Sequence, residues 1–305
     1  MCPSCLFYGR DVMDNGTNGL ILESLGGIYT VEDENGELLK LKARGIFRKD
    51  GFSPCAGDRC IIKDGVISEI EERKNSIIRP PLANLDVMVF VVSTCEPAPN
   101  LTLLDKFIAV CEYKSIEPVI AVTKVDLKEN SLIPEIYGKI GISVVVCDYE
   151  NDGGLDVIRE KIKGKICAFT GNTGAGKSTL LNHLAPELEI KTAEISRKLG
   201  RGRHTTRVSR LYKLFDGYAA DTPGFSSFET MQYAVILKDK LKYCFREFEE
   251  YEDKCRFADC SHIKEKGCEV LEAVKRGNIA PSRHESYCEM YEEAKNIKEW
   301  EINEK

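Results

Sequence analysis

A glycine-rich stretch, GNTGAGKS at residues 171–178, constrains the fold of this 305-residue chain more than any other feature. An apolar run at 166–170 with the character of a strand precedes it, and a helical pattern at 179–184 follows it. A phosphate-binding loop needs this strand–loop–helix setting, because its glycines let backbone N–H groups turn toward phosphate oxygens at a helix N-terminus. We therefore predict a nucleotide site in an α/β domain, where Lys177 reaches the β- and γ-phosphates and the Ser178 hydroxyl ligates Mg²⁺. A glycine-rich turn without a ligand is the alternative.

A second motif, Thr123-Lys124-Val125-Asp126, follows another apolar run at 118–122. In open α/β sheets, ligands bind at the carboxyl ends of the strands. A carboxylate placed there accepts hydrogen bonds from the N1–H and the 2-amino group of guanine, a donor pair that adenine does not present. Asp126 therefore favours GTP over ATP, and the stem of Lys124 is expected along the purine face. Thr123 stands where most GTPases carry asparagine, and this change removes an amide contact.

A third strand is expected at 143–146, followed by Cys147 and Asp148. GTPases usually carry Ser-Ala at these two positions, with a backbone N–H that faces O6 of guanine. Since a backbone contact tolerates a change of side chain, we expect Cys147 and Asp148 to border the base.

The sequence Asp221-Thr222-Pro223-Gly224 follows an expected strand at 218–220. We predict that Asp221 holds Mg²⁺ through water and that the Gly224 N–H contacts the γ-phosphate. A simple turn containing proline and glycine is the alternative.

The segment GRHTT at 202–206 lies where a GTPase carries its first switch. One of Thr205 and Thr206 is expected to close on Mg²⁺, and the sequence does not say which. Phe225 stands where Ras-like enzymes carry a glutamine that orients water, and a phenyl ring makes no such hydrogen bond. His204 is the candidate catalytic residue in its place, since imidazole orients water near neutral pH. Alternatively, His204 only supports the switch or contacts a partner.

The motifs occur in a permuted order, because the base-reading motif precedes the phosphate loop, whereas a Ras-like chain has the reverse order. After Gly224 the chain runs directly into a C-terminal segment, which a nucleotide switch could therefore move. The predicted Mg²⁺ ligands are Ser178, Thr205, Thr206 and Asp221. The predicted GTP-binding residues are Thr123, Lys124, Asp126, Cys147, Asp148, Gly171, Asn172, Thr173, Gly174, Ala175, Gly176, Lys177, Ser178, Thr179 and Gly224.

The C-terminal segment contains four residues with metal-ligand spacing, Cys255-x4-Cys260-x-His262-x5-Cys268. Three thiolates and one imidazole complete the tetrahedral set of a structural zinc site and leave no position open for catalysis. Unliganded thiols are the alternative, since the chain contains 13 cysteines.

The charge distribution bears on the partners. The net charge of −6 argues against indiscriminate polyanion binding, but residues 196–210 contain six Arg and Lys side chains and no acidic residue. This run either lies in solvent or meets the phosphates of RNA. No apolar run reaches membrane-spanning length and the N-terminus lacks a signal-peptide core, so we expect no membrane partner. Phosphate chemistry together with a thiolate site indicates reduced cysteines and a cytoplasmic protein, which we expect to be a monomer.

The hydrophobic periodicity changes along the chain. Short alternating runs at 27–32, 38–43 and 60–63, separated by turns, predict a small barrel, and residues 1–18 carry no pattern. Strands that alternate with helices then predict an α/β sheet covered on both faces. The predicted domains are an OB-fold-like β-barrel at 1–74, a linker at 75–85, a permuted α/β GTPase domain at 86–228, and an α-helical zinc domain at 229–305 with helices at 231–250 and 281–300.

With these parts in place, the chain resembles the ribosome small-subunit-dependent GTPase A family of circularly permuted GTPases. The resemblance covers residues 19–305 and rests on the motif order, on the segments GNTGAGKST, GRHTT, DTPGF and RPPLANLD, and on the Cys-Cys-His-Cys pattern. It implies an OB-fold barrel, a permuted GTPase core and a zinc domain. It also implies GTP hydrolysis on the small ribosomal subunit and its RNA, late in subunit assembly, with a catalytic role for His204. Thr123, Cys147 and Asp148 depart from the family pattern.

Three other functions are compatible with parts of the pattern. A permuted GTPase with another ribosomal role is the nearest. A nucleotide-gated RNA-binding module with negligible turnover is favoured by Phe225. A P-loop metabolic kinase would need an acceptor site for a small substrate, for which the sequence has no signature.

Overall fold

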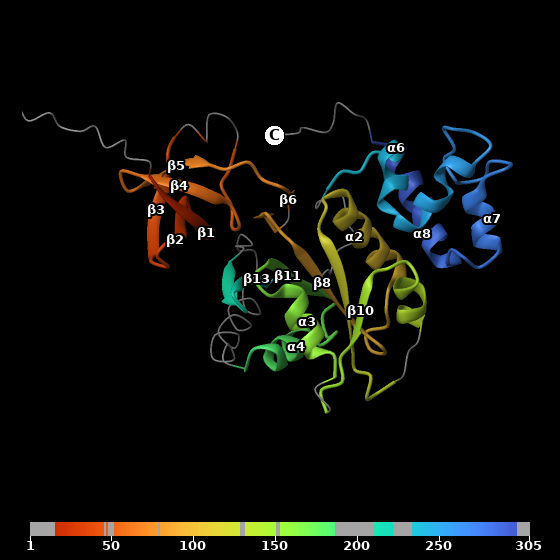
Figure 1. Cartoon of the computed structure of the whole chain (residues 1–305), viewed down its shortest axis with the longest axis horizontal. Helices are drawn as coiled ribbons and strands as arrows, with labels where there is room; N and C mark the ends of the chain where they lie inside the picture. The colour runs from red at the N-terminus through yellow and green to blue at the C-terminus, as the bar shows by residue number, and fades with distance from the viewer. Residues whose placement is uncertain are drawn as a thin grey trace, which may run out of the picture.

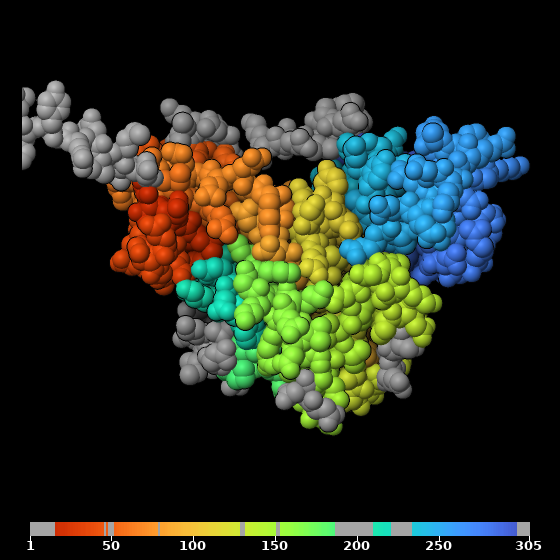
Figure 2. Space-filling view, viewed as in Figure 1, coloured from red at the N-terminus to blue at the C-terminus, as the bar shows by residue number. Residues whose placement is uncertain are grey.

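The computed structural model describes residues 16–45, 47, 52–78, 80–128, 132–150, 153–186, 210–221 and 234–297. The predictions for His204, Thr205, Thr206 and Gly224, and the position of Phe225, lie outside these residues. A barrel and a group of helices lie on opposite sides of a central α/β part (Figure 1). In the space-filling view both pack against the central part (Figure 2).

Five strands close into an N-terminal barrel in the order β1-β2-β3-β5-β4. Neighbouring strands are antiparallel except for β3 and β5, which are parallel. The alternation along the strands places Ile21, Val31 and Ile67 inside the barrel with no exposed surface. The predicted OB-like barrel is therefore confirmed. Its strands are β1 (Thr17–Leu25), β2 (Ile28–Asp33), β3 (Leu38–Ala43), β4 (Arg59–Lys63) and β5 (Val66–Ile70).

The central part contains a six-stranded sheet in the order β10-β9-β8-β11-β13-β12. Its strands are parallel except for the edge strand β12, which is antiparallel to β13. The chain enters the sheet in the middle, at β8, extends to one side through β9 and β10, and then returns to β11. Because of this path, the motif after β9 precedes the phosphate loop after β11 in the sequence, which is the permuted order. The strands are β8 (Val87–Ser93), β9 (Glu117–Thr123), β10 (Ser143–Val146), β11 (Ile166–Gly171), β12 (Leu211–Leu214) and β13 (Gly217–Asp221).

Helices cover both faces of the sheet, as the sequence predicts. Strand β8 shows why, because Met88 and Phe90 pack with α2 and η1 on one face, whereas Val87, Val89 and Val91 pack with α3 and α4 on the other. The covering elements are α2 (Leu101–Tyr113), the π-helical turn η1 (Pro134–Gly138), α3 (Leu155–Ile162) and α4 (Lys177–Leu184).

The segment predicted as a linker forms a short antiparallel ladder of β6 (Ser76–Ile77) and β7 (Leu82–Ala83). Leu82 is fully buried and shares one hydrophobic core with Leu22 and Ala56 of the barrel region and with the sheet. Next to it, a Cβ atom built on Gly57 would lie 2.0 Å from the Ala83 carbonyl oxygen. The barrel is therefore packed against the sheet through this ladder.

The C-terminal group departs from the predicted helix at 231–250. Among its described residues, α6 (Lys238–Leu241) is followed by the 3₁₀ segments η4 (Lys242–Cys244) and η5 (Arg246–Lys254). Phe245, Phe248 and Tyr251 are all buried, and a spacing of three residues matches the 3₁₀ period. This spacing also resembles an α-helical pattern, so the predicted helix is present at Lys238–Leu241, whereas the segments Lys242–Cys244 and Arg246–Lys254 are 3₁₀ and not α-helical. The remaining helices are α7 (Glu269–Lys275) and α8 (Pro281–Ala294), the second of which begins where the sequence predicts.

Helix α2 is shared by the central sheet and the C-terminal group. Phe107 and Ile108 pack on the sheet, whereas Ala109 and Val110 belong to the core of the C-terminal group. The C-terminal group therefore docks on α2, a contact that the sequence did not indicate. The ion pairs across this contact are Asp105–Arg283, Lys106–Glu289, Lys106–Glu293 and Glu112–Arg246.

Candidate nucleotide and metal sites

The phosphate-loop residues lie between β11 and α4, in the strand–loop–helix setting that the sequence predicts. A Cβ atom on Gly171 would lie 2.5 Å from the Val91 carbonyl oxygen of β8, and Gly176 has a left-handed φ of +92° at the N-cap of α4. Neither position accepts a side chain without strain. Lys177 begins the helix, and Ser178 and Thr179 are exposed next to it. The loop is thus built from backbone at a helix N-terminus, as phosphate binding requires.

Thr123 joins the base-reading motif to the phosphate loop. It is fully buried at the end of β9, and its hydroxyl donates to the Ala175 carbonyl oxygen at 2.6 Å. The hydroxyl is therefore committed to a protein acceptor. Thr123 therefore helps to hold the phosphate loop in place through the Ala175 carbonyl oxygen.

Lys124 and Asp126 follow Thr123 directly after the carboxyl end of β9. Lys124 has a left-handed φ of 59°, and its carbonyl oxygen accepts from the Thr94 hydroxyl at 2.7 Å. Its ammonium donates to the Glu96 carbonyl oxygen. Asp126 is exposed. The loop after β8 therefore holds the base-reading motif, a role for Thr94 and Glu96 that sequence reasoning missed because these residues match no motif.

The backbone at the predicted guanine O6 contact is already engaged. The Cys147 N–H donates to the Val122 carbonyl oxygen at 2.8 Å, and the Asp148 N–H donates to the Gly153 carbonyl oxygen at 3.1 Å. The Cys147 side chain is buried. A contact from either N–H to a base would break one of these bonds, so the predicted backbone contact stays a prediction.

Asp221 is the last residue of β13, and its backbone lies beside Phe169 of β11 in parallel register. Since β9, β10, β11 and β13 are parallel, the segments that follow them lie at one edge of the sheet. The structure thus brings together the predicted base-reading, phosphate and Mg²⁺ segments that it describes.

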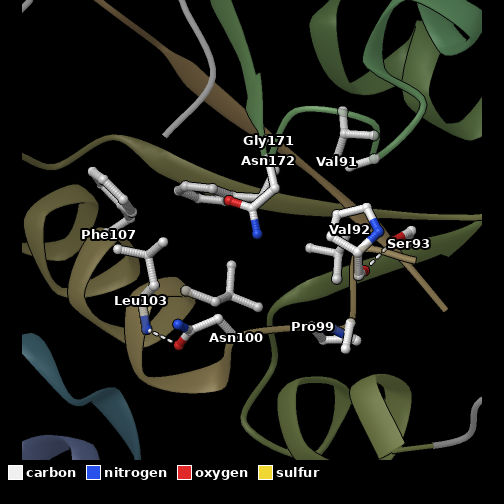
Figure 3. Close-up of a pocket in the computed structure, with 14 residues that line it drawn as sticks. Val91, Val92, Ser93, Pro99, Asn100, Leu103, Phe107, Gly171 and Asn172 are labelled. Carbon is white, nitrogen blue, oxygen red and sulfur yellow. Dashed lines mark hydrogen bonds between the residues drawn. The ribbon is translucent and has the colours of Figure 1, made fainter. Parts of the chain in front are cut away.

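A pocket lies beside the phosphate loop, between Gly171, Asn172 and the start of α2 (Figure 3). Leu103 and Phe107 line it, and the Asn100 side chain caps the helix by accepting from the Leu103 N–H at 2.9 Å. Helix α2 therefore borders the phosphate loop at its N-terminus and contacts the C-terminal group along its length.

The four predicted metal ligands converge, because their candidate ligand atoms all lie within 4.8 Å of one another. His262 Nδ1 lies 3.6 Å from the sulfur of Cys255 and 3.5 Å from that of Cys268, and the two sulfurs are 3.9 Å apart. Cys260, His262 and Cys268 are buried. This Cys₃His cluster can hold a metal ion.

Glu265 organises the loop around the cluster. Its carboxylate accepts from the backbone N–H groups of Ser261, Ile263 and Lys264, each at 3.0 Å, and from the Ser261 hydroxyl. Burial opposes its charge, but these hydrogen bonds lower the pKa of Glu265 to about 2. The carboxylate is therefore ionised at neutral pH and holds the turn between His262 and Cys268, another role that the ligand spacing did not reveal.

Comparison with known proteins decides the family. The family model of the RsgA GTPase matches residues 70–231, and that of the RsgA N-terminal domain matches residues 18–77. The chain belongs to the RsgA GTPase family. It is 41% identical over 290 residues to the small ribosomal subunit biogenesis GTPase RsgA of Clostridium beijerinckii, covering 92% of this chain and 99% of the relative. The RsgA protein of Bacillus velezensis is also 41% identical, over 293 residues, covering 92% of this chain and 98% of the relative.

Solved structures of the family agree with the fold. The crystal structure of YjeQ from Thermotoga maritima has a TM-score of 0.77 and 33% identity, covering 92% of this chain and 99% of that one. The structure of YloQ, a circularly permuted GTPase, has a TM-score of 0.75 and 33% identity, covering 95% of this chain and 99% of that one. As an RsgA-family protein, the chain is a GTPase. Within its described part, no helix combines the length and apolarity needed to cross a membrane.

Proposed function

We propose that this RsgA-family GTPase hydrolyses GTP as a factor in the late maturation of the small ribosomal subunit, binds ribosomal RNA, and leaves the subunit after hydrolysis. The observation that carries the proposal is the meeting of the phosphate loop, the base-reading motif and the end of β13 at one edge of the sheet. The names of the relatives support the ribosomal role. GTP, GDP and the subunit are then its partners, and it acts as a cytoplasmic monomer.

The GTP site consists of the predicted residues in three roles. The loop from Gly171 to Thr179 holds the phosphates, Asp126 and Lys124 read the base, and Cys147 and Asp148 border it. Ser178, Asp221 and one of Thr205 and Thr206 hold Mg²⁺, and Gly224 contacts the γ-phosphate. When bound, Mg²⁺ neutralises charge that develops on the phosphate oxygens. His204 orients the attacking water.

Zinc is the metal that fits the Cys₃His cluster best. Zinc–sulfur bonds of about 2.3 Å and zinc–nitrogen bonds of about 2.1 Å place tetrahedral ligand atoms roughly 3.5–3.8 Å apart. The separations among Cys255, His262 and Cys268, at 3.5, 3.6 and 3.9 Å, are close to these values, and all four ligand atoms lie within 4.8 Å of one another. The site uses four protein ligands, so its role is structural.

The packing of α2 suggests how a change of bound nucleotide could alter the position of the C-terminal group. Its first turn lines the pocket beside Gly171 and Asn172, and its remaining turns carry the ion pairs to the C-terminal group. A change at the phosphate loop would therefore move the C-terminal group through α2, in addition to the direct chain connection after Gly224. Residues 196–210 supply positive charge for RNA phosphates.

The test is GTP hydrolysis by the zinc-loaded full chain, alone and with small ribosomal subunits, compared between wild type and His204→Ala. We expect strong stimulation by the subunits in the wild type and loss of stimulation in the variant. GDP affinity serves as the control, since it should be unchanged if the variant is folded. Absence of stimulation despite tight GTP binding would instead support the RNA-binding module with negligible turnover, which Phe225 at the position of the usual glutamine favours.

A further inference from the structure

Tyr149 lies at the nucleotide edge but belongs to none of the motifs. It follows β10 after Cys147 and Asp148, and its ring is stacked on His183 of α4 with centroids 4.4 Å apart and an interplanar angle of 11°. Its hydroxyl oxygen is buried and has no hydrogen-bond partner among the described residues. A buried hydroxyl without a partner is unfavourable, because it loses its bonds to water and gains none.

The surroundings of Tyr149 place it beside the base-reading motif. Strand β10 is paired in parallel with β9, with Val146 opposite Val122, so the residues after the two strands continue side by side. Burial, the Cys147 thiol and the Asp126 carboxylate together raise the pKa of Tyr149. The hydroxyl is therefore protonated at neutral pH and can donate a hydrogen bond. His183 connects the ring to the helix that begins at the phosphate loop.

The usual donors to guanine are engaged elsewhere in this chain. The Thr123 hydroxyl donates to the Ala175 carbonyl oxygen, where most GTPases carry an asparagine amide. The Cys147 and Asp148 N–H groups donate to backbone carbonyl oxygens. A guanine whose N1–H and 2-amino group are bound by Asp126 still presents O6, an acceptor on the same edge of the base that needs a donor.

We propose that the Tyr149 hydroxyl donates a hydrogen bond to O6 of the bound guanine and so acts as a specificity-determining residue of the GTP site. The inference rests on the proposed GTP-binding function. It assigns a partner to the Tyr149 hydroxyl and explains how O6 is read when the Thr123 hydroxyl and the Cys147 and Asp148 N–H groups donate to protein acceptors.

The test compares binding of GDP, 6-thio-GDP and inosine diphosphate to wild type, Tyr149→Phe and the exposed-tyrosine control Tyr243→Phe. Sulfur at position 6 is a weaker acceptor, so the wild type should prefer GDP over 6-thio-GDP. Tyr149→Phe keeps the stacked ring and should weaken GDP binding by about 3- to 10-fold, while its preference over 6-thio-GDP falls toward one. The preference for GDP over inosine diphosphate should be unchanged, because Asp126 reads the 2-amino group. Tyr243→Phe should behave as wild type.

Two further measurements distinguish a failure of the role proposed for Tyr149 from a failure of the proposed GTP site. Thermal unfolding without nucleotide should show Tyr149→Phe to be as stable as wild type or more stable, since the lost hydroxyl has no partner in the part of the chain that the structure describes. An unchanged discrimination against 6-thio-GDP, or an equal loss for all three nucleotides, would overturn the role of Tyr149. If the wild type bound no guanine nucleotide, or if Asp126→Asn kept the preference over inosine diphosphate, the proposed GTP site itself would be at fault.

Discussion

Arg283 of α8 and Asp105 of α2 form a buried ion pair, with Nη1 and Oδ1 2.7 Å apart and side chains that are 1% and 0% exposed. The same guanidinium donates through Nε to Glu247 at 2.7 Å and through Nη2 at 3.1 Å. The Tyr137 hydroxyl also donates to Asp105, at 2.7 Å. These contacts join the C-terminal group to the helix that borders the phosphate loop.

Replacement of Arg283 by alanine should destabilise the protein by about 3–5 kcal/mol, because two carboxylates would remain buried without their cation. Urea unfolding followed by circular dichroism measures this change. Lys295→Ala is the matched control, since its ion pair with Glu292 on the same helix is exposed and contributes little. A loss in Arg283→Ala no larger than that in the control would show that the pair does not hold the two parts together.

Removal of one metal ligand should empty the cluster. In Cys260→Ser we expect zinc affinity to fall by more than about 100-fold and the C-terminal group to lose cooperative unfolding, because three remaining ligands no longer complete the tetrahedron. Metal content by mass spectrometry and competition with a chelator measure the affinity. Cys288→Ser, a thiol outside the cluster, should retain one zinc per chain. Full zinc occupancy in Cys260→Ser would exclude Cys260 as a ligand.

Loss of the Thr123 hydroxyl should loosen the phosphate loop. In Thr123→Val the Ala175 carbonyl oxygen loses its donor at a fully buried position, which costs about 1–3 kcal/mol of stability. GDP affinity should fall by roughly 3- to 10-fold, because the loop is no longer held in the binding conformation. Titration with a fluorescent GDP analogue measures the affinity. Wild-type affinity in this variant would mean that the loop does not depend on Thr123.

A methyl group at Gly57 should separate the barrel from the sheet. Its φ is +94° and the new Cβ would lie 2.0 Å from the Ala83 carbonyl oxygen, so we expect Gly57→Ala to lose more than about 3 kcal/mol of stability. The control is Gly65→Ala, which has a left-handed φ of +71° but no neighbour within 4 Å of the new methyl group. Thermal unfolding of both variants separates the clash from backbone strain. Equal losses in the two would contradict the packing described for the β6–β7 ladder.

The chemistry-bearing segments were largely predictable because each depends on local sequence. The strand, the loop and the helix around Gly171 could be predicted from three local features within about 20 residues. These are a run of apolar residues, the glycines of the loop, and a helical pattern after it. The Cys₃His cluster was predictable for a similar reason, since its four residues lie within one short stretch of the chain. The 3₁₀ segments after α6 were mistaken for a helix, because residues three apart also share a face of an α-helix.

The sequence by itself determined the order of the motifs, the barrel, the sheet with helices on both faces, and the four residues of the metal cluster. Tertiary structure decided which polar groups remain available, because hydrogen-bond partners come from distant positions: Thr123 bonds to a residue 52 positions away, and Asp105 to one 178 positions away. Such pairings cannot be predicted from the composition or from the spacing of residues in the sequence. They form only when parallel strands and packed helices bring separate segments within 3 Å or so of one another. For this reason only the folded chain shows that the hydroxyl of Tyr149, which belongs to no motif, has no hydrogen-bond partner among the described residues.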